Sequence, residues 1–333
     1  MALSVPLLVS DLHLTSKPLD EYRWGLFPWL IRTISKRDVT HLFILGDLTD
    51  AKDYHSAKLV NRVVEELLTV IKSTGVRITI LRGNHDGIDP DCAYFKFLGR
   101  FPEIVYVDRP QMLGSLALLP HSRDPQTDWA SQDLSTAKLV LMHQTMNGVV
   151  AENGVELPGL AESVFASVPR NAHIYSGDIH VPQKIGRVEY VGAPYHIRFG
   201  DKFVGNAVLL DGKGVALRLA VPSIRRAVLT VHTGADTGLE KLNEGDQVKV
   251  RLMLAERELA DAAKLKRAIS EECEEMKVQL CGVEIVRREA LKTPAALKTA
   301  QQAPKALFDA YCLRHAPAAQ AKELGASILG ALR

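Results

Sequence analysis

The sequence predicts an α/β protein with a mostly parallel sheet, followed by a smaller α/β unit. Short β-rich runs alternate near the start of the chain with two helical patterns, over about residues 21–35 and 56–73. That order of elements is typical of parallel βαβ units. Apolar residues make up 47% of the 333 residues and charged residues 24%, which are ordinary values for a globular protein. This length favours one large domain plus a smaller one.

Five strands are expected in the first two hundred residues, because five short apolar runs each stop at turn-forming or polar residues. The runs cover residues 5–10, 41–45, 77–81, 138–142 and 173–176. Ligands of open α/β sheets bind outside the carboxyl ends of the strands. Polar residues follow each run at that position, so we expect a functional site at this edge.

The rest of the chain changes pattern after residue 184, where short strands and tight turns predict a second, antiparallel-leaning sheet. Pro222 then marks a break. We expect four parts: a main domain over residues 1–222, a small α/β unit over residues 223–290, a linker over residues 291–304 and amphipathic helices over residues 305–333. The linker is rich in Ala, Lys, Gln and Pro, a composition that suits a tether.

Composition indicates an intracellular protein. The four cysteines are scattered, with no Cys-x-x-Cys pair, which is typical of reduced thiols. The first ten residues lack the basic region of a signal peptide, and no apolar run reaches about 18 residues. We therefore expect a cytoplasmic protein that does not span a membrane. The net charge of +2 neither supports nor excludes a nucleic-acid partner, because acidic ligands can offset a basic stripe.

The polar residues after the strands have the chemistry that a dinuclear metal centre needs. Two divalent ions about 3.5–4 Å apart can offset phosphoryl charge, activate water and stabilise a leaving oxygen. Carboxylate, imidazole and amide ligands together suit Mn²⁺, Fe or Zn²⁺ better than Ca²⁺. One polar cluster alone would more often be a turn or a surface group, whereas five in series indicate a site. The candidate ligands are Asp11, His13, Asp47, Asn84, His143, Asp178 and His180.

Local geometry supports this set. Asp11 and His13 share a face, since residues two apart do so in extended structure. Glycines precede Asp47, Asn84 and Asp178, where the backbone must turn sharply beside a crowded site.

These motifs resemble the calcineurin-like metallophosphoesterase family, whose pattern is Asp-x-His, Gly-Asp-x-x-Asp, Gly-Asn-His-[Asp/Glu], a lone His and Gly-His-x-His. The resemblance implies a four-layer α/β/β/α sandwich. It also implies that one metal is held by Asp11, His13, Asp47 and His180. The other would be held by Asp47, Asn84, His143 and Asp178, with Asp47 as the bridge. His85 matches the family's non-ligand histidine, which acts on the leaving group, and Asp86 would orient that imidazole.

One position departs from the family pattern, because Asp178 stands where the family has a histidine. Aspartate is a shorter and harder ligand, which shifts metal preference toward Mn²⁺ or Mg²⁺. We expect two divalent ions, Mn²⁺ first, with Mg²⁺, Fe or Zn²⁺ as alternatives. A scaffold that has lost the second metal is the competing interpretation of this position.

Later segments resemble the SbcD-type nucleases of DNA double-strand-break repair. The similar segments are residues 118–123, 178–183, 190–201 and 221–225. The small α/β unit fits the capping domain of those nucleases, and the resemblance covers nearly the whole chain, most strongly through about residue 226. The chain is compact for that family, which fits a phage-encoded or otherwise reduced version.

This second resemblance implies a nuclease that degrades DNA ends and cuts single strands or hairpins during repair, recombination or replication. It also implies a partner, an SbcC-type coiled-coil ATPase, on which we expect the apolar faces of the C-terminal helices to dock. Folding of these helices back onto the cap is the alternative. The aromatic cluster near the first helix is expected to pack in the core. The resemblance also allows a homodimer contact in this region.

Four residues outside the metal shell are candidates for contact with DNA phosphates, which needs little more than placed cations. They are His121, Arg123, His196 and Arg198. Solvated loops explain them about equally well.

The main alternative function is a phosphatase or small-molecule phosphodiesterase of the same superfamily. Such enzymes need no α/β cap followed by a linker and helices, which favours the nuclease. Activity on a monoester compared with a diester or single-stranded DNA separates the two.

Overall fold

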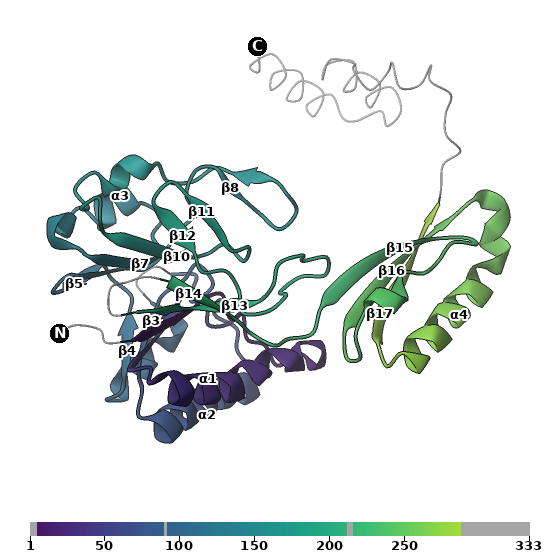
Figure 1. Ribbon diagram of the computed structural model, residues 1–333, viewed down its shortest axis with the longest axis horizontal. Coiled ribbons are helices and arrows are strands. Elements are labelled where there is room, and N and C mark those ends of the chain that lie inside the picture. The colour runs from purple at the N-terminus through teal and green to yellow at the C-terminus, as the bar shows by residue number, and fades with distance from the viewer. Residues whose placement is uncertain (1–4, 90–91, 212–215, 288–333) are drawn as a thin grey trace, which may run out of the picture.

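The structure, a computed structural model, describes residues 5–89, 92–211 and 216–287. The expected linker over residues 291–304 and the helices over residues 305–333 lie outside the described residues. Two six-stranded sheets form the centre of the main domain, and a three-stranded sheet with a helix follows (Figure 1).

The first sheet has the strand order β14-β13-β1-β2-β3-β4. Its strands are β1 (Pro6–Val9), β2 (His41–Leu45), β3 (Arg77–Leu81), β4 (Ile104–Val107), β13 (Asn206–Leu210) and β14 (Ala216–Ala220). Strands β1 to β4 are parallel, as the alternation of strands and helices predicted. Strands β13 and β14 return late in the chain and pair antiparallel at the edge beside β1.

The second sheet has the order β11-β12-β10-β7-β6-β5. Its strands are β5 (Gln111–Leu113), β6 (Leu116–Leu119), β7 (Leu139–His143), β10 (His173–Gly177), β11 (Gln183–Ile185) and β12 (Val188–Tyr190). The prediction of a separate antiparallel-leaning sheet after residue 184 is wrong. Strands β11 and β12 join a sheet whose inner strands are parallel, while β13 and β14 belong to the first sheet.

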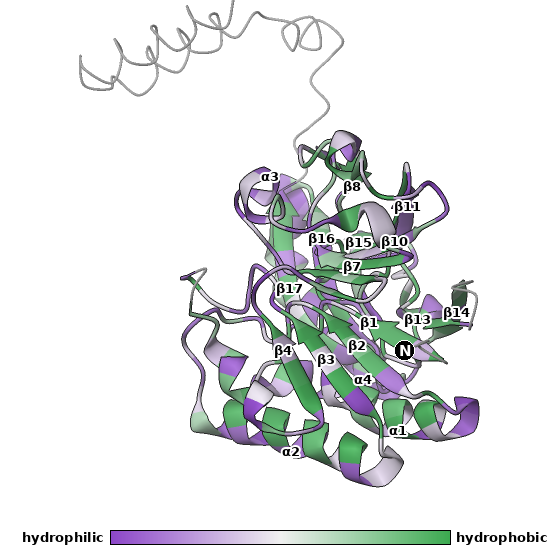
Figure 2. Cartoon of the chain, turned by 90° about the vertical axis from the view of Figure 1, so that its left-hand side faces the viewer, coloured by the Kyte–Doolittle hydropathy of each residue, from purple (hydrophilic) through white to green (hydrophobic). Residues whose placement is uncertain are grey.

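Helices α1 (Leu26–Arg37) and α2 (Ala57–Thr74) cover the outer face of the first sheet (Figure 1). The 3-10 helix η1 (Pro18–Gly25) leads into α1. The Ser56 side chain caps α2 by accepting a hydrogen bond from the Leu59 amide, which satisfies one of the free donors of the first turn. Apolar residues recur along α2 at helical spacing and are buried. Figure 2 shows hydrophobic and hydrophilic residues alternating along both α1 and α2.

Three apolar cores separate four layers. One core lies between the two sheets and contains Leu8, Phe43, Leu118, Leu141 and Tyr175. A second joins the first sheet to α1 and α2. The third lies under short helices on the outer face of the second sheet: α3 (Pro125–Asp128), η3 (Leu134–Thr136) and η4 (Glu162–Phe165). The α/β/β/α sandwich is therefore confirmed, with only short helical segments as its fourth layer.

The small α/β unit consists of β15 (Arg226–His232), β16 (Gln247–Leu254), β17 (Gln279–Arg287) and α4 (Ala262–Glu275). Its three strands are parallel and pack, together with α4, around a core of their own. It contacts the main domain at η1, where Gln247 donates a hydrogen bond of 2.7 Å to the Leu19 carbonyl. Across the parts of the chain that the structure describes, no helix combines the length and apolar character of a membrane span.

Candidate metal centre

Both sheets contribute their strand ends to one site, where all seven predicted ligands lie. Asp11 and His13 follow β1, Asp47 follows β2, and Asn84 follows β3. The second sheet contributes the other three: His143 is the last residue of β7, and Asp178 and His180 follow β10. The register of the second sheet pairs Gly177 with His143, which places the ends of β7 and β10 side by side.

The backbone at four of these residues is in the left-handed region. Asp11, His13, Asp47 and Asp178 have φ angles of 56°, 42°, 54° and 82°. Only two other non-glycine residues among those described share this feature, and both follow helices. Such conformations cost about 1–3 kcal/mol each and cluster at functional sites. The strain is therefore concentrated where the ligands must turn toward a common point.

Two glycines allow the close approach that the site requires. A Cβ atom on Gly46 would lie 2.1 Å from Nδ1 of His143, and one on Gly83 would lie 2.1 Å from Oδ1 of Asp47. Any side chain at either position would displace a predicted ligand. The sequence analysis expected a sharp backbone turn at these glycines, and the φ angle of 88° at Gly46 agrees with that expectation.

Asp47 occupies the middle of the site. Its Oδ2 lies 3.4 Å from Nε2 of His13, and its Oδ1 lies 3.5 Å from Nε2 of His143. The carboxylate is buried and accepts a hydrogen bond of 2.9 Å from the His85 amide. Its two oxygens therefore face histidines on opposite sides, as a bridging ligand would.

The first half of the site brings together Asp11, His13 and His180, whose donor atoms all lie within 4.8 Å of one another. The Nε2 atoms of His13 and His180 are 3.1 Å apart. Three buried lone-pair donors that converge in this way suit a divalent cation.

The second half is centred on His143. Its Nδ1 lies 2.6 Å from the Leu45 carbonyl, so Nδ1 carries a proton and Nε2 is the ring nitrogen that faces the site. The Asn84 Oδ1 lies 3.1 Å from that Nε2 and 3.0 Å from each Asp47 oxygen. In this orientation the Asn84 oxygen faces acceptor atoms, as an amide ligand of a cation would, whereas a turned amide would donate its NH₂ to the same atoms. Asp178 Oδ1 lies 3.7 Å from the His143 Nε2, close enough to share the site.

The charge balance also fits cations. Burial raises the pKa of Asp11 and of Asp47, because these carboxylates have lost their water. Burial opposes protonation of His143, but the charges of Asp47 and Asp178 outweigh it and raise the pKa of His143 to about 9. Buried carboxylates that have lost their water regain a counter-charge when a divalent metal binds between them.

His85 lies next to the centre, with its ring centroid 4.8 Å from that of His13. Its Nδ1 is 2.8 Å from the Asp50 carbonyl. The expectation that Asp86 orients this imidazole is wrong, because the Asp86 carboxylate is fully buried and accepts hydrogen bonds from the amides of Asp47, Leu48 and Gly83. Asp86 holds the backbone of the Asp47 turn instead.

The four candidate DNA contacts separate into different roles. His196 is buried, its Nε2 lies 2.8 Å from the Phe203 carbonyl and its Nδ1 accepts from the Arg226 amide. One ring nitrogen bonds within the main domain and the other bonds to the first residue of β15. Neither is left for DNA, so the prediction of a DNA contact at His196 is wrong.

His121 lies beside the centre, 6.2 Å from His143 between ring centroids. Burial lowers the pKa of His121 to about 4, so this ring is neutral at pH 7 and cannot act as a cation. Arg123 and Arg198 are exposed, as a phosphate contact requires.

Two supporting residues were missed by the sequence analysis. Glu152 contacts the Nδ1 of His180, and the Thr145 hydroxyl donates to Oδ2 of Asp178. Neither belongs to a family motif, and an isolated Glu or Thr in a loop carries no sequence signal. Their position after His143 in the chain was the only available indication.

A hollow of about 490 Å³ adjoins the centre at Asp50. Lys17 and Arg198 supply exposed cations to it, and Lys17 Nζ lies 3.8 Å from Asp50 Oδ2. Arg226, the first residue of β15, also lines the hollow. The hollow therefore extends from the centre toward the small α/β unit.

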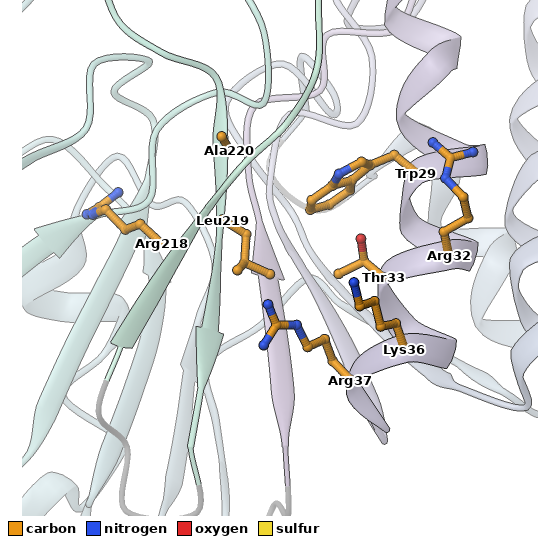
Figure 3. Close-up of a pocket in the computed structure, with 8 residues that line it drawn as sticks. All are labelled: Trp29, Arg32, Thr33, Lys36, Arg37, Arg218, Leu219 and Ala220. Atoms are coloured by element: carbon orange, nitrogen blue, oxygen red, sulfur yellow. The ribbon is translucent and has the colours of Figure 1, made fainter.

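A second hollow, of about 450 Å³, lies between α1 and β14 (Figure 3). Trp29, Thr33 and Lys36 extend from α1 on one side of it, whereas the Arg218 guanidinium points away (Figure 3) and pairs with Glu189. It contains none of the predicted site residues.

The match to a protein-family model agrees with the geometry of the centre. Residues 6–182 match the family model described as calcineurin-like phosphoesterase. No curated protein matches the sequence. Among solved structures, a dimetal phosphatase from Danio rerio is similar at 11% identity and a TM-score of 0.39, over 67% of this chain and 100% of that one. A cold-active protein tyrosine phosphatase is similar at 13% identity and a TM-score of 0.30, over 65% of this chain and 79% of that one.

The family match spans more than half of the chain and includes every predicted metal ligand. The chain therefore belongs to the calcineurin-like phosphoesterase family of metal-dependent phosphoester hydrolases.

Proposed function

We propose that this phosphoesterase is a DNA nuclease of the SbcD type, which cleaves phosphodiester bonds at DNA ends and in single strands or hairpins. The cationic hollow beside the centre is the observation that carries this proposal. A monoester substrate ends at its phosphate, whereas a DNA strand continues past the scissile bond and needs cations along its path. Lys17 and Arg198, which line the hollow, are the cations that we expect to meet the next phosphate.

We assign the first ion to Asp11, His13, Asp47 and His180, and the second to Asp47, Asn84, His143 and Asp178. When bound, the two ions offset the charge on the phosphoryl oxygens and activate water. We take Mn²⁺ as the first candidate for both positions, because the ligand set mixes carboxylate, amide and imidazole groups.

His85 is the proposed proton donor to the leaving oxygen. Its Nδ1–H donates to the Asp50 carbonyl, which leaves Nε2 as the atom that gains and releases a proton on the side of the centre. A positioned donor of this kind contributes about 10²–10⁴ in rate. Asp86 acts indirectly, because its carboxylate fixes the turn that carries Asp47.

The small α/β unit is proposed to guide DNA as a cap. It is joined to η1 beside the hollow through Gln247 and through the Arg226–Asp20 ion pair of 3.2 Å. These contacts support a cap that lies beside the proposed path of the DNA strand. The C-terminal helices over residues 305–333 are proposed to dock on an SbcC-type ATPase.

The experiment compares three substrates at saturating Mn²⁺: single-stranded DNA, bis-p-nitrophenyl phosphate and p-nitrophenyl phosphate. The nuclease proposal predicts cleavage of DNA and of the small diester, and weak or no activity on the monoester. Efficient monoester hydrolysis without DNA cleavage would favour the phosphatase alternative.

Substitution of two residues that line the hollow adds a second test. The double variant Lys17→Ala/Arg198→Ala should lose more activity on DNA than on the small diester. Its affinity for single-stranded DNA should depend less on salt, with a log–log slope lower by about 1.4 if both cations meet phosphates. Lys264→Ala on the exposed face of α4 is the matched control. Equal losses on both substrates would contradict a role of the hollow in binding DNA.

A further inference from the structure

The segment that follows His143 supports two predicted ligands from outside the family motifs. It covers residues 144–160 and contains the hairpin of β8 (Val149–Val150) and β9 (Glu156–Leu157). Thr145 near its start donates to the Asp178 carboxylate, and Glu152 in the hairpin loop contacts the Nδ1 of His180. One continuous segment therefore reaches both ligands that follow β10.

The hairpin is held in place by Gln183, the first residue of β11. The Gln183 amide accepts a hydrogen bond of 2.9 Å from the Val150 N–H and donates one of 2.8 Å to the Val150 carbonyl. Glu152 lies only two residues further along. The Glu152 carboxylate therefore lies in a loop that directly follows an anchored strand.

The start of the segment is held by Tyr190, the last residue of β12. The Tyr190 hydroxyl donates to the Gln144 carbonyl at 2.9 Å and accepts from the Met146 amide at 2.8 Å. Thr145 lies between these two anchor points. Gln183 and Tyr190 belong to segments that carry the sequence resemblance to nucleases, and their side chains serve this segment instead of facing the centre.

Glu152 is well placed to control His180. The side chains are only 17% and 10% exposed, respectively, so water competes weakly for their contact. The carboxylate faces Nδ1, which leaves Nε2 as the atom directed at His13 and the centre. A carboxylate on the far nitrogen of a ligating histidine fixes its tautomer and ring orientation and makes it a more basic ligand.

We propose that Glu152 is a positioning residue of the metal centre, which sets His180 for coordination through Nε2 and is itself held by the Gln183-anchored hairpin. This role rests on the proposed dinuclear centre and not on DNA as the substrate. It predicts that metal affinity depends on a residue outside all five motifs.

The test is titration of metal-free protein with Mn²⁺ by calorimetry, together with the melting temperature of the metal-free form. Glu152→Ala should weaken the affinity for one of the two ions by about 10–100-fold. Glu152→Gln keeps an oxygen that can accept from Nδ1–H, so it should recover most of that loss. Glu156→Ala, on the exposed face of the same hairpin, should bind both ions as the wild type does.

Two results would overturn the proposal. Wild-type affinity in Glu152→Ala, even with a lowered melting temperature, would reduce the contact to a structural ion pair. Loss of one ion in both Glu152→Ala and Glu152→Gln would make Glu152 a ligand rather than a positioning residue.

The proposed function can fail separately. A wild-type protein that binds a single Mn²⁺ contradicts the two-ion centre. A weakened affinity of Glu152→Ala for that one ion would still support the positioning role.

Discussion

Asp86 offers a sharp test, because its observed position and its expected role predict different results for the same variant. The carboxylate accepts three backbone hydrogen bonds: Oδ2 from the amides of Asp47 at 3.0 Å and Gly83 at 2.6 Å, and Oδ1 from the Leu48 amide at 3.0 Å. In Asp86→Asn the one remaining side-chain oxygen can best replace Oδ2, which accepts from two amides. The NH₂ group must then face the Leu48 N–H, which leaves one buried donor unpaired.

The cost of that unpaired donor is about 1–3 kcal/mol. In a domain of this size each kcal/mol lowers the melting temperature by about 2–4 °C, so we expect a drop of about 2–12 °C. The measurement is thermal unfolding of the metal-free protein by circular dichroism, with Asp236→Asn, an exposed carboxylate of the small α/β unit, as the control. Activity should also fall, because the Asp47 turn loses its anchor. An unchanged melting temperature combined with a large loss of rate would refute this account and restore Asp86 as the partner of His85.

Three further predictions follow from single residues. His85→Ala should retain both ions and lose about 10²–10⁴ in rate, measured by metal analysis beside steady-state kinetics; metal loss in proportion to activity would make His85 a ligand. Asp178→Ala should leave one tight ion and no catalysis while Asp178→His keeps substantial activity, and full activity in the alanine variant would place Asp178 outside the centre. Burial lowers the pKa of His41 to about 4, below the usual value near 6.5, so the folded state binds fewer protons and stability should fall as the pH drops from about 6.5 toward 4. His41→Gln should flatten that part of the pH profile of unfolding, and an unaltered profile would contradict the assignment.

The sequence was sufficient to predict that the candidate ligands converge, because each lies at a strand end and the ends of parallel strands meet at one edge. Asp11 and Asp47, which follow neighbouring strands of the first sheet, could be placed from this rule alone. The rule does not say which sheet a strand joins. The strands that end near His143 and Asp178 were therefore predicted, but the second sheet to which they belong was not. That sheet brings the two residues opposite the first sheet.

Side-chain partners were harder to predict, since they depend on loop paths that no periodicity encodes. Asp86 follows His85 directly in the chain, yet its carboxylate turns toward the backbone of Asp47. His196 is near the last motif in sequence but is buried against β15. Glu152 is far from His180 in sequence, and only the path of the hairpin brings the two together.

The central claim is that one carboxylate, Asp47, joins two metal ions in a single phosphoesterase centre. The most direct measurement is the Mn²⁺ content per chain after equilibration and gel filtration, for the wild type and for Asp47→Ala. Because both Asp47 oxygens face the centre, within 3.5 Å of His13 and His143, we expect two ions per wild-type chain and loss of both in the variant, with no remaining diester hydrolysis. Two ions retained by Asp47→Ala, or none bound by the wild type, would contradict the account.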